Sequence, residues 1–149
     1  MSDFSVPKSY DLSDEAGTAA VAAELAAQLA SPCVIALWGD LGAGKTSFAR
    51  ALIRAMPGVD GAQEVPSPTF TLLQTYDTDA GPLYHFDLYR IEDPSELIEL
   101  GWDDAIDEGI CLIEWPDKAG NQLPTDRLDI NITHGSTPNA RTIKIGRPS

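Results

Sequence analysis

The sequence predicts an α/β fold in which a mixed parallel and antiparallel sheet is flanked by helices. An apolar run at residues 33–38 indicates a buried strand, and a glycine-rich loop and a helix over residues 46–56 follow it. Two later pairs of strand-like runs are each joined by turn residues, which is typical of antiparallel hairpins. The chain has 149 residues, 43% of them hydrophobic, so we expect a single domain over residues 1–149 with its own core.

The first elements of the chain are predicted from the capping and chain-breaking residues at their ends. Residues 5–12 are expected to form an edge strand or an extended arm. Ser13 is the predicted N-cap of an alanine-rich helix that runs to about residue 30, where Ser31-Pro32 ends it. After the 46–56 helix, Pro57-Gly58 breaks the pattern, and we expect a flexible segment as far as Pro66.

The later elements are predicted from strand-like runs and the turn chemistry between them. They are a hairpin of strands 69–76 and 83–89 around turn 77–82, a short helix 94–100, an apolar strand 110–115, and a second hairpin of strands 127–134 and 141–145 around turn 135–139. In the 83–89 strand, alternation places Tyr84, Phe86 and Leu88 on one face. His85, Asp87 and Tyr89 then lie on the other face.

The loop after the first apolar run matches G-x-x-x-x-G-K-[ST], the pattern that holds nucleoside triphosphates. The predicted nucleotide-binding residues of this loop are Gly39, Asp40, Leu41, Gly42, Ala43, Gly44, Lys45, Thr46 and Ser47. Glycine lets backbone N–H groups approach the phosphates, and the positive end of the following helix points at them. We expect Lys45 to reach the β and γ oxygens and Thr46 to bind a magnesium ion. The alternative is a glycine turn without a ligand, and the strand-loop-helix context argues against it.

Two acids in predicted strands are candidates for the chemistry. Glu114 ends the apolar 110–115 run, where phosphate-loop proteins place the carboxylate of the magnesium shell, although a terminal acid on a strand is common. Asp87 in mid-strand orients the attacking water or holds the water shell of the metal, unless it only forms a salt bridge with Arg90. We expect His85 to satisfy a backbone group. Thr69 follows the flexible segment, as a metal-sensing switch residue does, or simply begins a strand.

The charge distribution restricts the partners. The net charge is −13, and residues 92–108 contain eight acids and no Lys or Arg, so stable direct binding to nucleic acid is not expected. The acidic stretch is interpreted as a solvated surface that aids solubility, or as a docking face for a basic partner. No leader pattern or long apolar run suggests export or membrane insertion, and we expect a cytoplasmic location. Cys33 and Cys111 are expected to be buried free thiols.

Four motifs in this order resemble the TsaE family, the small ATPase subunit of the bacterial machinery that makes threonylcarbamoyladenosine in tRNA. They are residues 39–46 of the loop, Ser67-Pro68-Thr69-Phe70-Thr71-Leu72, Tyr84-His85-Phe86-Asp87-Leu88-Tyr89-Arg90 and Ile113-Glu114-Trp115-Pro116. The resemblance covers about residues 13–116.

This resemblance implies an ATPase that works with the TsaB and TsaD proteins and does not itself bind tRNA. It implies that Lys45 binds phosphates, that Thr46 and Glu114 hold magnesium, and that Asp87 serves hydrolysis. Trp115 then lies beside the site, and the start of the first helix, including Glu15, lies near the adenine.

Other classes of protein share a phosphate loop. A small-molecule kinase usually closes arginines over the transferred phosphate, and no Lys or Arg lies between Arg54 and Arg90. A GTPase needs an N-K-x-D segment, which the sequence lacks. A nucleotide-gated adaptor with negligible catalysis is the stronger alternative.

Overall fold

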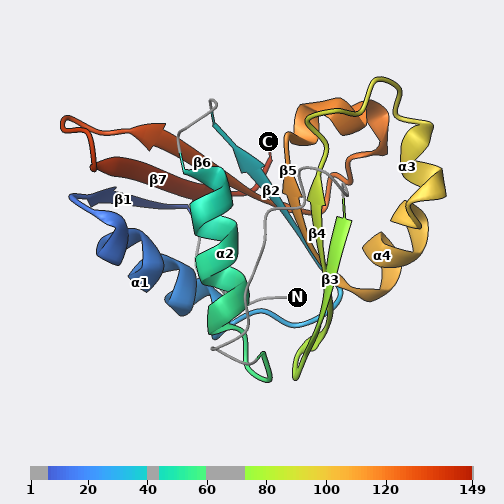
Figure 1. Cartoon of the computed structure of the whole chain (residues 1–149), viewed down its shortest axis with the longest axis horizontal. Coiled ribbons are helices and arrows are strands. Elements are labelled where there is room, and N and C mark those ends of the chain that lie inside the picture. Colours follow the sequence, from blue (N-terminus) through green and yellow to red (C-terminus); the bar gives the residue numbers. More distant parts are fainter. Residues whose placement is uncertain (1–6, 40–43, 60–72, 149) are drawn as a thin grey trace.

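A seven-stranded mixed sheet forms the centre of the fold (Figure 1). The computed structural model describes residues 7–39, 44–59 and 73–148. The strands are β1 (Lys8–Leu12), β2 (Cys33–Trp38), β3 (Leu73–Thr78), β4 (Gly81–Asp87), β5 (Ile110–Glu114), β6 (Leu128–His134) and β7 (Arg141–Gly146). They lie in the order β1-β7-β6-β2-β5-β4-β3. The predicted α/β fold with a mixed sheet is therefore confirmed.

The middle of the sheet is parallel and its two sides are antiparallel. β2 lies between β5 and β6 and runs parallel to both, and β4 runs parallel to β5. The hairpins β3–β4 and β6–β7 are antiparallel, and β1 joins the sheet at the edge by pairing with β7. Both predicted hairpins and the predicted edge strand are confirmed. Because the parallel strands point the same way, their carboxyl ends meet at one edge of the sheet.

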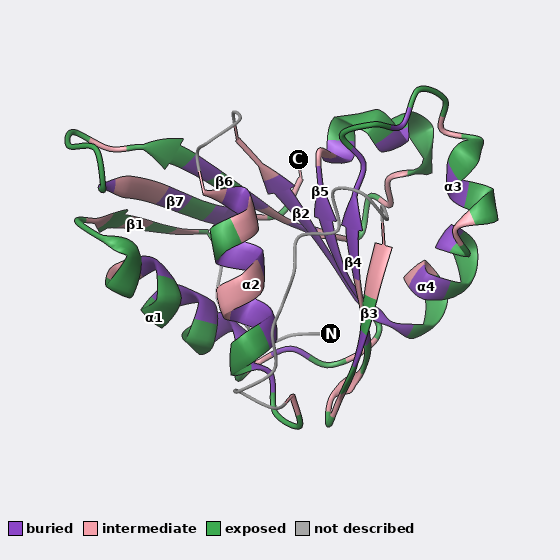
Figure 2. Cartoon of the chain, viewed as in Figure 1, coloured by how far each residue is buried: buried purple, intermediate pink, exposed green. Residues whose placement is uncertain are grey.

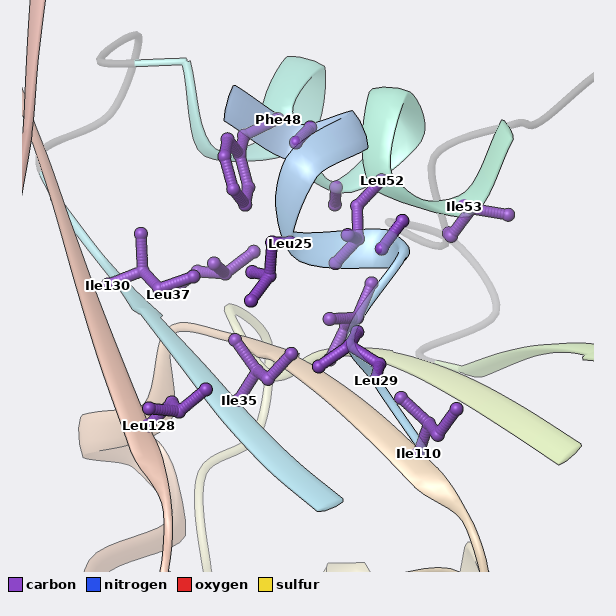
Figure 3. Close-up of a cluster of buried hydrophobic side chains, with 14 of the residues drawn as sticks. Leu25, Leu29, Ile35, Leu37, Phe48, Leu52, Ile53, Ile110, Leu128 and Ile130 are labelled. Atoms are coloured by element: carbon purple, nitrogen blue, oxygen red, sulfur yellow. The ribbon is translucent and has the colours of Figure 1, made fainter. Parts of the chain in front are cut away.

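Helices cover both faces of the sheet. The helices are α1 (Glu15–Ala26), α2 (Lys45–Ala55), α3 (Glu96–Glu99), α4 (Trp102–Glu108) and the 3-10 helix η2 (Pro116–Gln122). Figure 3 shows Leu25 of α1 and Phe48 and Leu52 of α2 packed against Ile35 and Leu37 of β2. On the opposite face, Leu97 and Trp102 of the acidic stretch belong to a second buried cluster. Figure 2 shows the resulting pattern of buried central strands and exposed outer helix faces.

The alternation predicted for β4 is confirmed by the core clusters. Phe86 and Leu88 belong to the cluster that includes Trp102, and Tyr84 packs against it. Leu83 belongs to the cluster on the α1 and α2 face. Residues of the same parity as Leu83 therefore point toward the helix that follows the phosphate loop.

Several predicted boundaries are wrong. The N-cap of α1 is Asp14, whose carboxylate accepts the backbone N–H of Gly17 at 3.0 Å, and not Ser13. α1 ends at Ala26 and not at residue 30. The turn of the first hairpin is tighter than predicted, because β3 extends to Thr78 and β4 already begins at Gly81. The flexible segment expected before Pro66, and Thr69, lie outside the described residues.

The acidic stretch folds into more helix than the sequence analysis predicted. It contains α3, which is shorter than the predicted 94–100 helix, and α4, which was not predicted. α4 buries Trp102 and Ala105, which lie three residues apart on one helix face. All eight acids between residues 92 and 108 are exposed, which agrees equally with a solvated surface and with a docking face for a basic partner.

The two cysteines are buried and free, as predicted. Burial raises the pKa of the Cys111 thiol to about 12, and it also raises the pKa of Cys33. A nucleophilic cysteine needs a lowered pKa, so neither thiol is suited to catalysis.

None of the helices in the described ranges is long and apolar enough to span a membrane.

The cap of α1 can be tested by two adjacent substitutions. Asp14→Ala removes the acceptor for the Gly17 N–H and is expected to lower the free energy of unfolding by about 0.5–2 kcal/mol. Ser13→Ala is the matched control and is expected to change it by less than about 0.5 kcal/mol. Urea unfolding of both variants measures the difference. An equal loss of unfolding free energy in the two variants would contradict the assignment of Asp14 as the N-cap.

Candidate phosphate and metal site

Three of the predicted site residues lie at or directly after the ends of parallel strands. β2 leads into Gly39, β4 ends at Asp87 and β5 ends at Glu114. In the register of the sheet, Glu114 lies opposite Leu37 on one side and opposite Asp87 on the other. By the alternation of side chains along β4 and β5, Asp87 and Glu114 point to the face of the sheet that α1 and α2 cover. The fold therefore places both carboxylates beneath the start of α2.

The phosphate loop is described at its two ends only, because residues 40–43 lie outside the described residues. Gly44 has φ 105° and is the N-cap of α2, a conformation that residues with a side chain rarely adopt. α2 begins at Lys45, and the first N–H groups of a helix have no carbonyl partner within the helix. Such a helix start attracts anions.

Lys45 is held at the mouth of the loop. Its side chain is buried, and Nζ donates to the carbonyl oxygen of Gly39 at 2.5 Å. The same Nζ lies 3.4 Å from the centroid of the Trp115 ring. A lysine cation over an indole face is stabilised by the ring quadrupole. These contacts place the ammonium group beside Gly39, at the end of β2.

The carboxylate of Glu114 is the centre of a short hydrogen-bonded chain. Thr46 Oγ1 donates to Glu114 Oε1 at 2.7 Å, and His85 Nε2 lies 2.6 Å from Glu114 Oε2. Glu114 is 1% exposed and His85 is fully buried. The expectation that His85 satisfies a backbone group is wrong, because its partner is the side chain of Glu114. The buried carboxylate thus has a partner at each oxygen.

Asp87 lies beside Glu114 and is also buried. Its Oδ1 accepts the backbone N–H of Tyr89 at 3.1 Å, and the backbone N–H of Leu88 donates to the Glu114 carbonyl at 3.1 Å. The Leu88 bond joins the end of β4 to the end of β5, and the Tyr89 bond holds the Asp87 carboxylate against its own chain. The role of Asp87 in hydrolysis stays a prediction.

Trp115 lies beside the site, and its backbone is strained. Its φ and ψ of 57° and 53° make it the one non-glycine residue with positive φ in the described ranges. A residue of this size rarely adopts this conformation, which is found preferentially at functional sites. Its indole lies over the Lys45 ammonium group, and the Tyr89 ring contacts the indole at a centroid distance of 5.0 Å.

A pocket of about 270 Å³ opens beside the start of α2. It is lined by residues of α1, α2, β6 and the β6–β7 hairpin, among them Glu15, Gly44 and Ser47. The fold therefore brings the start of the first helix next to the phosphate loop, and the adenine role of Glu15 stays a prediction.

The basic wall of this pocket was missed by the sequence analysis. Arg50 and Arg54 line it from α2, and Arg141 lines it from β7. A Cβ on Gly44 would lie 3.5 Å from Arg141 Nε. Sequence reasoning searched for arginines only between residues 54 and 90. The spacing of Ser47, Arg50 and Arg54 along one helix face was the available signal, whereas nothing in the sequence indicated that Arg141 would reach the loop.

Comparisons with known proteins relate the chain to one family. The family model "Threonylcarbamoyl adenosine biosynthesis protein TsaE" matches residues 12–143. A TsaE protein of Rickettsia felis is 40% identical over 81% of this chain and 70% of its own, and one of Bacillus subtilis is 45% identical over 74% and 68%. The crystal structure of Bacillus subtilis YdiB superposes with a TM-score of 0.75 at 31% identity, covering 95% of this chain and 86% of that one.

Proposed function

The chain belongs to the TsaE family, and we propose that it is a magnesium-dependent ATPase that serves threonylcarbamoyladenosine modification of tRNA together with TsaB and TsaD. The observation that carries the proposal is the hydrogen bond from Thr46 to Glu114 at the start of α2. It joins the last residue of the phosphate-loop motif to the carboxylate at the end of a neighbouring parallel strand. This is the pair that phosphate-loop proteins use for the metal of a metal–triphosphate complex.

The oxygen atoms of this site suit a magnesium ion that is bound to the phosphates of a nucleotide. Thr46 offers a hydroxyl and Glu114 a carboxylate, and hard cations such as magnesium prefer oxygen ligands. In the described ranges, no cluster of three or more His, Cys, Asp or Glu side chains could hold a metal by itself. Magnesium is commonly bound by one or two protein oxygens with phosphate and water, so a partial site is what it requires. When bound, the ion offsets charge on the transferred phosphoryl group.

Phosphate binding falls to Lys45 and the start of α2. Nζ donates to the Gly39 carbonyl and lies over the Trp115 ring. A triphosphate offers the ammonium group charge-assisted acceptors at the same place. The exchange needs little movement, because the lysine already lies beside the loop.

Hydrolysis is assigned to the edge formed by β4 and β5. The oxygen of a water molecule attacks the γ-phosphorus in line, and the bond from that phosphorus to the β–γ bridging oxygen breaks, which releases ADP and phosphate. Asp87 is the acid that orients this water, since it is buried beside Glu114 without being part of the Thr46 contact. Its backbone bond from Tyr89 holds it in place.

The adenosine end of the nucleotide is assigned to the 270 Å³ pocket. The pocket is lined by Gly44 and Ser47 at the start of α2 and by Glu15 at the start of α1. Arg50, Arg54 and Arg141 give this wall positive charge in a chain of net charge −13. A cationic pocket that continues from the phosphate loop favours an anionic nucleotide.

Substitution of the two acids separates binding from chemistry. Asp87→Ala is expected to keep ATP affinity within a few fold and to lose most hydrolysis, because orienting water acts mainly in the transition state. Glu114→Ala is expected to lose the magnesium dependence of nucleotide binding. Titration calorimetry and phosphate release measure the two effects, and Asp77→Ala, an exposed acid of β3, is the charge control. Normal hydrolysis by Asp87→Ala with partners present would assign Asp87 to structure alone.

Partner dependence tests the assembly. We expect slow hydrolysis by the chain alone, well under the enzyme median of about 10 per second, and faster hydrolysis with TsaB and TsaD. By linkage, ATP must then change partner affinity by the factor by which the partners change ATP affinity. Phosphate release by the purified chain, alone and with both proteins, measures the response. Negligible turnover in every mixture would favour the nucleotide-gated adaptor, and fast turnover without any response would favour an independent kinase or phosphatase.

A further inference from the structure

We propose that His85 is a positioning residue for Glu114, and that it fixes the carboxylate so that Oε1 faces Thr46 and the metal. This inference rests on the proposed function, because it concerns the metal side of the same site. It assigns His85 no contact with nucleotide.

The two carboxylate oxygens have different partners. Oε2 lies 2.6 Å from His85 Nε2, deep in the sheet, and Oε1 accepts from Thr46 Oγ1 at 2.7 Å, at the start of α2. A carboxylate that holds magnesium is ionised and can only accept, so the ring must donate through Nε2. With Oε2 held by that donor, the carboxylate cannot rotate away, and Oε1 stays directed at the metal position.

The requirements of folding alone do not explain why the polar ring of His85 is buried in the sheet. The ring is fully buried, and its Nδ1 has no hydrogen-bond partner in the part of the chain that the structure describes. On the same sheet face, Leu83 two residues earlier and Ile110 of the adjacent strand are apolar core residues. An unpaired buried nitrogen opposes folding, so an apolar side chain would suit this layer better. We infer that a histidine occupies this position, despite the unfavourable burial of Nδ1, because its Nε2 contacts Glu114.

Outer contacts of this kind tune metal sites. A ligand side chain is commonly oriented by a second residue, and loss of that residue lowers metal affinity by about 10-fold to 100-fold. Here the usual arrangement is reversed, since the histidine orients and the carboxylate binds. The effect on the metal is expected to be of the same size.

Two substitutions at one position give a matched test. His85→Gln places an amide N–H donor about as far along the side chain as Nε2, whereas His85→Asn reaches only as far as Nδ1. The probe is Mn²⁺, titrated by electron paramagnetic resonance into the complex of each variant with β,γ-imido ATP. We expect His85→Asn to bind Mn²⁺ about 10-fold or more weakly and His85→Gln to stay within about 3-fold of wild type. Nucleotide affinity in EDTA is expected to be unchanged in both.

The outcomes separate the two proposals. Equal losses in the Gln and Asn variants, or none in Asn, would overturn the positioning role while the proposed function stands. Absence of nucleotide-dependent Mn²⁺ binding by the wild type would overturn the proposed function and this inference with it. If neither variant folds, long-range proton–nitrogen correlation of the wild-type histidine rings decides. A proton on Nε2 of His85 supports the role, and a bare Nε2 overturns it.

Discussion

The buried carboxylate of Glu114 is the constraint around which the candidate site is organised. A carboxyl group at 1% exposure is costly unless its oxygens have hydrogen-bond partners, and removal of one partner leaves a buried polar atom unsatisfied. Glu114 obtains one partner from the helix after the phosphate loop and one from the neighbouring strand β4. The start of α2, the end of β5 and the middle of β4 are thereby tied to one another.

The parallel centre of the sheet makes this arrangement possible. β4, β5 and β2 end at the same edge, so Asp87, Glu114 and the phosphate loop meet although they are far apart in the sequence. The antiparallel hairpins extend the sheet without moving that edge. One of them, β6–β7, also brings Arg141 to the pocket beside the loop. The exposed acidic surface lies on the other face of the sheet, where Leu97 and Trp102 pack, and not on the face that α2 covers.

Sequence patterns predicted the elements whose formation depends on residues close together in the chain. The apolar run of β2 and the strand end at Glu114 each have a signature within a few residues, and both positions agree closely with the prediction. The N-cap was assigned to Ser13 because Ser and Asp are similar caps, and only backbone geometry selects Asp14. The sequence pattern did not predict α4, because acids dominate this stretch and only Trp102 and Ala105 mark the buried face of the helix. The partners of His85 and Arg141 depend on strand register and hairpin placement, which one sequence does not specify.

The central claim is that the start of α2 binds nucleotide phosphates through Lys45. Titration calorimetry of β,γ-imido ATP with magnesium into wild type, Lys45→Ala and Lys144→Ala tests it most directly. Lys144 is exposed on β7, so its loss removes the same charge away from the loop. Loss of the charge-assisted contact at Lys45 is expected to cost about 1.5–3 kcal/mol, or roughly 10-fold to 150-fold in affinity, with Lys144→Ala near wild type. Wild-type affinity in a folded Lys45→Ala variant would contradict the phosphate site.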